Sequence, residues 1–165
     1  MQEQRSRTVR LPLRGGCQCG AVRYAVEAAP LTLYACHCSE CQKQSASAFG
    51  MSMLVRRHGL EVAWDALKAW QRPTPSGGTL VCHFCPACGT RLFHVGSDDE
   101  AIVSVKAGSL DDRSWLVPAG HIWTRSAQSW IELPAGTLRY EAQPPDMAPL
   151  VDAWRTMTTT WFVAA

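Results

Sequence analysis

The chain has 165 residues, of which 47% are hydrophobic and 18% are charged, so it can bury the core of a single globular domain and does not resemble a disordered segment. Its formal net charge is only +2, which excludes the strongly basic composition of a nucleic-acid-binding domain. No apolar stretch reaches the length of a membrane span, and residues 1–14 lack the apolar run of a signal peptide. We therefore expect a cytoplasmic protein with no nucleic-acid partner and no membrane association.

Short strands make up most of the predicted secondary structure. Residues 21–27 alternate, with Val22, Tyr24 and Val26 on one side of the expected strand. Stretches that contain Gly, Pro and other turn-type residues separate this strand from the later ones. The further expected strands cover residues 31–38, 48–57, 77–84, 90–95 and 100–108. This spacing predicts an all-β domain of short antiparallel strands with little helix.

Helical structure is expected at only one or two places. A short helical turn is predicted to begin at Ser39, an N-cap residue type, and to carry Cys41 to Gln44. Residues 126–136 and the Pro-rich stretch at 141–149 are expected to be irregular. The tail from Asp146 to Ala165 admits a helix, although "TMTTTW" within it is a poor helix-forming sequence.

Eight cysteines are many for a chain of this length. In a reducing compartment they favour metal binding, whereas secretion would favour disulfides. Two pairs of cysteines are each expected to supply two ligands to one metal ion. In a strand, residues i and i+2 point to the same face, so Cys17 and Cys19 would point to one side. The sequence "CPACG" places Cys85 and Cys88 around a rigid turn before Gly89. These four thiols have the composition of a closed structural zinc site.

Cys36, Cys38 and Cys41 supply three more sulfurs, and no obvious fourth ligand follows them. Three protein ligands with one exchangeable position are the pattern of a catalytic zinc. A set of three thiolates suits a further soft ligand, namely an incoming thiolate. The sequence therefore predicts a second zinc ion whose remaining position is taken by a substrate.

Three other residues are candidates for the fourth ligand of this triplet. His37 lies between two of the cysteines, so strand alternation turns it to the opposite face. Cys82 is expected to be a small buried core residue. His83 is expected to flank a site rather than complete one. If one of these residues or a neighbouring subunit filled the position permanently, the chain would instead be a non-catalytic zinc module that binds a protein partner or a thiol metabolite.

The cysteine-bearing segments resemble the glutathione-dependent formaldehyde-activating enzyme (GFA) family, also called the centromere protein V/GFA family. The order and spacing of seven cysteines carry the resemblance, which runs from about residue 15 to 132. The matching stretches are "GGCQCGAVRY" at 15–24, "CHCSECQKQSASAFG" at 36–50, "FCPACGTRLF" at 84–93, "AGSLDD" at 107–112 and "HIWTRSAQSW" at 121–130.

The resemblance implies a β-tent fold, two zinc ions per chain and a carbon–sulfur lyase activity. It implies a GFA-like zinc domain at residues 15–132, preceded by an N-terminal strand or arm at 1–14 and followed by an extension at 133–165 that packs on the domain or trails it. The implied ligands are Cys17, Cys19, Cys85 and Cys88 for the structural zinc, and Cys36, Cys38 and Cys41 for the labile, catalytic zinc. The implied substrates are a thiol such as glutathione and an aldehyde, which condense to an adduct such as S-hydroxymethylglutathione.

Substrate-binding residues are predicted from position and charge. Glutathione carries two carboxylates, so we expect a positive rim near the triplet, with Lys43 as its best candidate and Arg23, Arg91, Lys106 and Arg125 as further ones. His121 is predicted to contact substrate or to move a proton. Gln42 stands where the family often has Arg, and Ala46 where it often has Gly; neither change removes a ligand.

Overall fold

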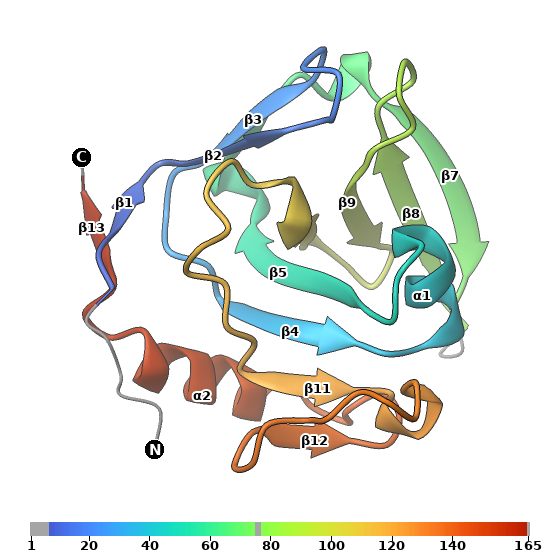
Figure 1. The fold of residues 1–165 in the computed structure, drawn as a ribbon. Helices are drawn as coiled ribbons and strands as arrows, with labels where there is room; N and C mark the ends of the chain where they lie inside the picture. Colours follow the sequence, from blue (N-terminus) through green and yellow to red (C-terminus); the bar gives the residue numbers. More distant parts are fainter. Residues whose placement is uncertain (1–6, 75–76, 165) are drawn as a thin grey trace.

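A computed structural model describes residues 7–74 and 77–164, so the first six residues of the expected N-terminal arm lie outside it. The described chain consists mostly of short strands with two α-helices (Figure 1), as the sequence predicts for an all-β domain with little helix. The strands are β1 (Val9–Leu11), β2 (Leu13–Gly16), β3 (Arg23–Val26), β4 (Thr32–Cys36), β5 (Gly50–Arg56), β6 (Leu60–Val62), β7 (Lys68–Pro73), β8 (Thr79–Phe84), β9 (Arg91–Gly96), β10 (Asp99–Lys106), β11 (Gly120–Ile122), β12 (Leu138–Tyr140) and β13 (Phe162–Ala164). The helices are α1 (Ser39–Ser45) and α2 (Ala148–Met157).

The strands form three sheets. An eight-stranded sheet has the order β12-β11-β4-β5-β10-β9-β8-β7, a three-stranded sheet has the order β2-β3-β6, and β1 pairs with β13. The long sheet is antiparallel from β4 to β7, but β11 runs parallel to both β4 and β12, and β1 is parallel to β13. These parallel pairs differ from the antiparallel expectation. They arise because β11, β12 and β13 return to the sheets from distant parts of the chain rather than through hairpins.

The core lies between the eight-stranded sheet and the three-stranded sheet. Leu33, Met53, Val105 and Phe93 are cross-strand neighbours in one row of the long sheet, and all four are fully buried. Tyr24 of β3 meets the Phe93 ring edge-on, with the ring centroids 5.1 Å apart. Burying each such side chain contributes about 1.5–3 kcal/mol. This row therefore holds the strands that carry the cysteines in a fixed register.

The opposite face of the long sheet is covered in part by the two helices. Thr32 of β4 donates a hydrogen bond to the Leu150 carbonyl of α2, and Gln44 of α1 contacts the Cys82 sulfur of β8. The tail is thus helical at residues 148–157, where the sequence left the choice open, and its last strand pairs with β1. Among the described residues no helix is both long and apolar enough to cross a bilayer.

Candidate functional site

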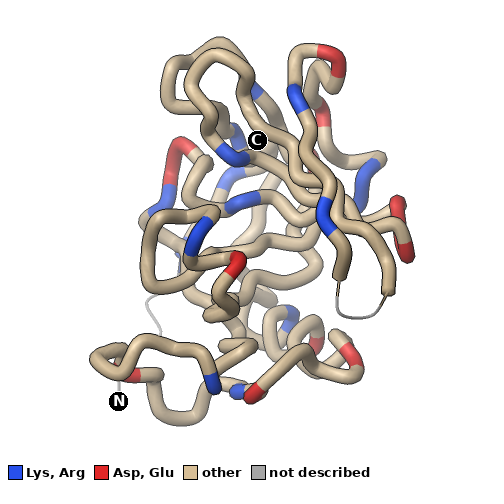
Figure 2. Tube along the Cα trace, turned by 90° about the vertical axis from the view of Figure 1, so that its right-hand side faces the viewer, with Lys and Arg blue, Asp and Glu red and all other residues tan. Residues whose placement is uncertain are grey.

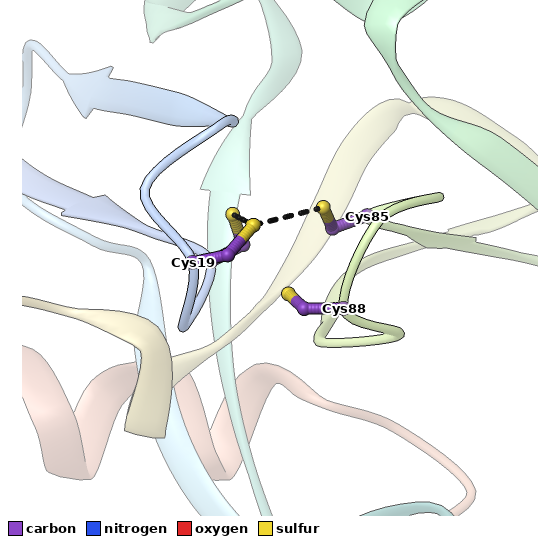
Figure 3. Close-up of side chains that lie close together, drawn as sticks. Cys19, Cys85 and Cys88 are labelled. Carbon is purple, nitrogen blue, oxygen red and sulfur yellow. Dashed lines mark hydrogen bonds between the residues drawn. The ribbon is translucent and has the colours of Figure 1, made fainter.

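Four cysteines from two loops converge on one point. Cys17 and Cys19 lie in the loop that follows β2, and Cys85 and Cys88 lie in the loop between β8 and β9; their four sulfurs are all within 4.8 Å of one another. Figure 3 shows Cys19, Cys85 and Cys88 pointing toward one another. The Cys19 sulfur lies 3.5 Å from that of Cys17 and 3.8 Å from that of Cys85.

The backbone around these cysteines is suited to holding them. Gly89 has a φ of +74°, the left-handed conformation that permits the sharp turn after Cys88. Thr90 links the two loops, because its Oγ1 lies 3.1 Å from the Cys88 sulfur and accepts a hydrogen bond of 3.1 Å from the Gln18 amide. The hydroxyl of Thr90 lowers the pKa of Cys88 to about 5, which favours the thiolate form that binds metals.

Cys36, Cys38 and Cys41 form the second group, with their three sulfurs within the same 4.8 Å limit. Cys36 ends β4, Cys38 is the N-cap of α1, and Cys41 lies in the first turn of that helix. The Cys38 sulfur accepts a hydrogen bond of 3.3 Å from the Cys41 amide. One strand end and one helix start therefore bring the three sulfurs together, which requires only local structure.

The three thiols differ in pKa because they hydrogen-bond to one another. Hydrogen bonds from Cys36 and Cys41 lower the pKa of Cys38, and the bond to Cys38 raises the pKa of Cys36. Without a cation the group thus concentrates negative charge on Cys38 and keeps Cys36 protonated. A bound divalent cation would replace the shared protons.

Both groups fit a metal ion by their chemistry and dimensions. Thiolate sulfurs are ligands for zinc and other soft metals, and tetrahedral zinc at a Zn–S distance of about 2.3 Å separates its sulfurs by roughly 3.8 Å. The observed separations of 3.5 and 3.8 Å in the first group are close to that value. The two groups could therefore each hold a metal ion.

The triplet gains no fourth ligand from the residues that the structure describes. The His37 Nε2 atom lies 3.0 Å from His121 Nδ1, and no His37 nitrogen lies within 4.8 Å of all three cysteine sulfurs. Cys82 is fully buried against Gln44, and His83 stacks edge-on against the Trp64 ring.

A cavity of about 430 Å³ lies close to the triplet, although no cysteine lines it. Gly50 lines it at the start of β5, and a Cβ placed on Gly50 would lie 3.4 Å from the Cys41 Cβ and 3.5 Å from Lys106 Nζ. Lys106 is only 9% exposed, and its ammonium donates to Ser52 Oγ at 3.2 Å. Thr90, which contacts Cys88, lies in the wall as well. One cavity thus adjoins residues next to both cysteine groups and contains a buried cation beside the triplet.

Comparison with known protein families identifies the chain. The model of the family described as "Glutathione-dependent formaldehyde-activating enzyme" (GFA) matches residues 12–126, more than half of the chain. The protein belongs to the GFA family. A crystal structure of a Rhodobacter sphaeroides protein, determined as a structural-genomics target, is similar with a TM-score of 0.50 and 21% sequence identity, over 78% of this chain and 99% of that one. At that identity the likeness concerns the fold alone.

In this GFA-family chain, Lys43 and His121 do not line the cavity beside the triplet. The Lys43 side chain is 75% exposed, and its ammonium pairs with Glu40 at 3.4 Å. His121 is buried against His37, and burial followed by the nearby His37 lowers the pKa of His121 to about 4. His121 is therefore neutral at pH 7.

The other cations considered from the sequence are divided by the structure into two kinds. Arg23 forms an ion pair with Asp111 at the surface, and Arg125 lies over the Trp123 ring. Arg91 and Lys106 line the cavity. Tertiary position, rather than closeness in sequence to the triplet, thus distinguishes the cations that can reach a ligand there.

Several cavity residues were not singled out from the sequence. Gly50 begins β5, and Gln44 follows the triplet on α1. Ser52, a polar residue within the mostly apolar strand β5, holds the Lys106 ammonium that lines the cavity. Gln42, which stands at a position where the family often has Arg, donates to the carbonyls of His37 and Ser126 and so fastens α1 to the loop after β11.

Proposed function

We propose that this protein is a zinc-dependent carbon–sulfur lyase of the GFA type. Its substrate would be the adduct of a thiol such as glutathione and an aldehyde such as formaldehyde, namely S-hydroxymethylglutathione. The observation that carries the proposal is the cysteine triplet, which has only three ligands among the described residues and lies behind Gly50 in the wall of a cavity. Membership of the GFA family supports the same activity.

The seven cysteines have two proposed roles. Cys17, Cys19, Cys85 and Cys88 would hold a structural zinc ion, which needs no further ligand. Cys36, Cys38 and Cys41 would hold the catalytic ion. When bound there, zinc would supply a position at which a substrate thiol, with an ordinary pKa of about 8.5, is held as its thiolate.

The residues of the cavity would bring the reactants together. In the condensing direction the thiol sulfur forms a bond to the aldehyde carbon, the thiol proton is released, and the carbonyl oxygen takes up a proton; the lyase direction reverses each change. Phe49 and Met51 add apolar surface to the wall of the cavity. Holding both reactants in one cavity removes much of the entropic barrier to their encounter.

Substrate contact is best assigned to Arg91 and Lys106, because both line the cavity. The roles proposed from the sequence for Lys43 and His121 require a substrate that extends beyond the cavity or a rearrangement of the buried His37–His121 pair. Lys43→Ala tests whether the substrate extends beyond the cavity to Lys43, since this exposed side chain has no packing role.

The activity can be tested by exchange spectroscopy of formaldehyde with glutathione in the presence of the zinc-loaded protein. We expect the wild type to accelerate the exchange of the adduct and Cys38→Ser to reduce the acceleration by at least about 100-fold, because one ligand of the proposed catalytic ion is lost. Cys82→Ser is the matched control, since Cys82 is a buried cysteine outside both groups.

Equal exchange rates for the wild type, Cys38→Ser and buffer would refute the formaldehyde reaction. Metal counting on the same samples then tests the alternative of a non-catalytic zinc module. A single ion or two equally tight ions in the wild type would support such a module, whereas two ions, one of which is readily removed with the fold intact, would support an enzyme.

A further inference from the structure

Polar side chains gather on the face of the long sheet that α1 covers. Cys82, His94 and Ser104 are direct cross-strand neighbours on β8, β9 and β10. Cross-strand neighbours share a face, and so do residues two apart on one strand. Lys106 therefore lies on the same face as Ser104. Gln44 of α1 contacts this face at Cys82.

Arg72 and Arg91 join this set. Arg72 pairs in register with Leu80, which is two residues from Cys82. Arg91 pairs with Phe84 beyond a β-bulge that interrupts the alternation, but it lines the same cavity as Gln44 and Lys106. We call Arg72, Arg91 and Lys106, whose charges all act on His94, the cationic cluster. Figure 2 shows several Lys and Arg positions in the central part of the trace, whereas Asp and Glu lie mostly at turns near its periphery.

Most buried side-chain atoms that lack a hydrogen-bond partner within the described chain belong to this face. Buried polar atoms are normally paired, so such a concentration calls for an explanation. His94 is the most enclosed of these residues, at 5% exposure. The unpartnered atoms on this face are Gln44 Oε1, Arg72 Nε, Arg91 Nη1, His94 Nε2 and Ser104 Oγ.

The cationic cluster has no carboxylate partner among the described residues. The three ion pairs found there join Arg23 to Asp111, Lys43 to Glu40 and Arg155 to Asp152. Lys106 is buried, and Arg72 and Arg91 are half-buried. Cations that are shielded from water without a counter-charge are costly, and several close together repel one another. A bound anion would remove both penalties.

Two members of the cluster connect it to the cavity beside the triplet. Arg91 and Lys106 line that cavity, with Ser45 and Ser47 as further hydrogen-bonding groups in its wall. Burial, with the charges of Lys106, Arg91 and Arg72, holds the pKa of His94 well below its usual range. His94 is therefore neutral at pH 7 and can donate one hydrogen bond.

We propose that the cationic cluster is a carboxylate-binding subsite, in which Arg91 and Lys106 contact a substrate carboxylate, Arg72 reinforces their positive field, and His94 can donate a hydrogen bond. The proposal rests on the proposed function, since it places the thiol of the same molecule at Cys36, Cys38 and Cys41. The enzyme then selects thiols that carry a carboxylate a few bonds from sulfur. Charge-assisted hydrogen bonds from a guanidinium to a carboxylate are among the strongest available for this selection.

Lys106 also lies close to Cys41, so its charge serves the thiolates as well as a substrate. Arg91 is the cleaner residue to change, because its guanidinium lies over the Phe84 ring at 5.3 Å and is not in the triplet. Arg57 offers a matched control. Its guanidinium lies over the Trp64 ring at 4.5 Å, so Arg57→Gln removes the same charge and the same kind of ring contact outside the cavity.

The experiment compares two thiols on the zinc-loaded full-length protein by calorimetric titration. The probe 3-mercaptopropionate carries a carboxylate, and 2-mercaptoethanol carries a hydroxyl in its place. After both dissociation constants are corrected for thiol ionisation, 3-mercaptopropionate should bind the wild type about tenfold more tightly than 2-mercaptoethanol. This difference is the gain expected from one or two charge-assisted hydrogen bonds. Arg91→Gln should reduce this ratio below about threefold, while Arg57→Gln should keep it.

A third probe, propionate, has no thiol and so reports the subsite alone. Its binding is followed through the imidazole NMR signals of His94, which should shift in the wild type and in Arg57→Gln but not in Arg91→Gln. Equal binding of the two thiols by the wild type, with no response to propionate, overturns the subsite and leaves the proposed function standing. A response to propionate without binding of either thiol supports the subsite and contradicts the proposed function.

Discussion

Thr90 illustrates how a single hydroxyl can join two metal half-sites. It accepts a hydrogen bond from the amide of Gln18 in the first loop, so its own proton is available to the sulfur of Cys88 in the second. Groups that hydrogen-bond to metal ligands typically change metal affinity by about 10- to 100-fold. Thr90 is therefore expected to support metal binding without being a ligand.

We expect Thr90→Val to weaken metal binding at the four-cysteine group by about 10-fold or more. The substitution keeps the shape of the side chain but leaves the Gln18 amide without its acceptor and the Cys88 sulfur without its donor. Competition with a chromophoric chelator measures the affinity. Thr90→Ser retains the hydroxyl and serves as the control; equal affinities for the Val and Ser variants would contradict the role of Thr90.

His94 gives a pH dependence of stability whose sign follows from its environment. Burial lowers its pKa in the folded state, so the unfolded state binds the proton first as the pH falls. The stability is fully present above the ordinary histidine pKa of about 6.5 and is lost below it, by at most about 1.4 kcal/mol per pH unit from this residue.

His94→Asn should therefore lose less stability than the wild type between pH 7 and pH 5.5. Urea unfolding at several pH values measures the difference, in a cationic buffer so that no buffer anion occupies the cationic cluster. His58, exposed at the surface, provides the control, because its substitution should leave the pH dependence unchanged. Parallel curves for the wild type and His94→Asn would show that His94 is not buried as a neutral group.

At the scale of elements, α1 decides the shape of the triplet. A helix of seven residues is too short to be stable alone, so tertiary contacts must hold it. Gln42 provides these contacts: its amide donates to His37 O and Ser126 O, and its oxygen accepts from Gln128. Gln42, at the position where the family often has Arg, thus connects α1 to the loop after β11 in this chain.

Gln42→Ala should destabilise the fold by about 1–2 kcal/mol and loosen the triplet more than the four-cysteine group. The first effect comes from the lost hydrogen bonds, and the second from the freedom gained by α1, which carries Cys41. Metal counting by mass spectrometry after mild chelation measures the second effect, the loss of metal from the triplet. Lys43→Ala, in the same helix but exposed, should retain both ions. Equal metal loss from the two variants would argue against this role of Gln42.

Most strands could be predicted from alternation and turn residues, because each such pattern is local. The expected strands at 31–38, 48–57 and 100–108 match β4, β5 and β10 closely. The exposed edge strand β7 has no apolar alternation, and the three-residue strands β11 and β12 are too short for a periodic pattern. Those elements exist because neighbouring strands pair with them, which no local pattern encodes.

Considered as a whole molecule, the four-cysteine group joins two distant parts of the chain. Its two halves lie at residues 17–19 and 85–88, so a metal ion held there would close a loop that contains β3 to β8 and α1. For a loop of roughly 70 residues, the entropy rule for cross-links gives a stabilisation of about 4 kcal/mol. The triplet closes only a few residues and contributes little in this way.

Removing the first metal should therefore unfold the protein more readily than removing the second. We expect Cys85→Ser to lower the stability by several kcal/mol and Cys38→Ser to lower it by less than about 1 kcal/mol, measured by thermal unfolding of the metal-loaded proteins. Cys82→Ser controls for the loss of a buried thiol. If the Cys85 and Cys38 variants were equally destabilised, the four-cysteine group would not be the principal cross-link.

The sequence by itself determined the local chemistry: two half-sites of two cysteines, one triplet, and the strands and helix start that carry them. It did so because residue spacing controls direction within one strand or turn. Only the tertiary structure decided that His37 pairs with His121, that Lys106 rather than Lys43 lies beside the triplet, and that Arg72, Arg91 and His94 share one face. These neighbours come from different strands, and the register between strands depends on packing across the whole sheet.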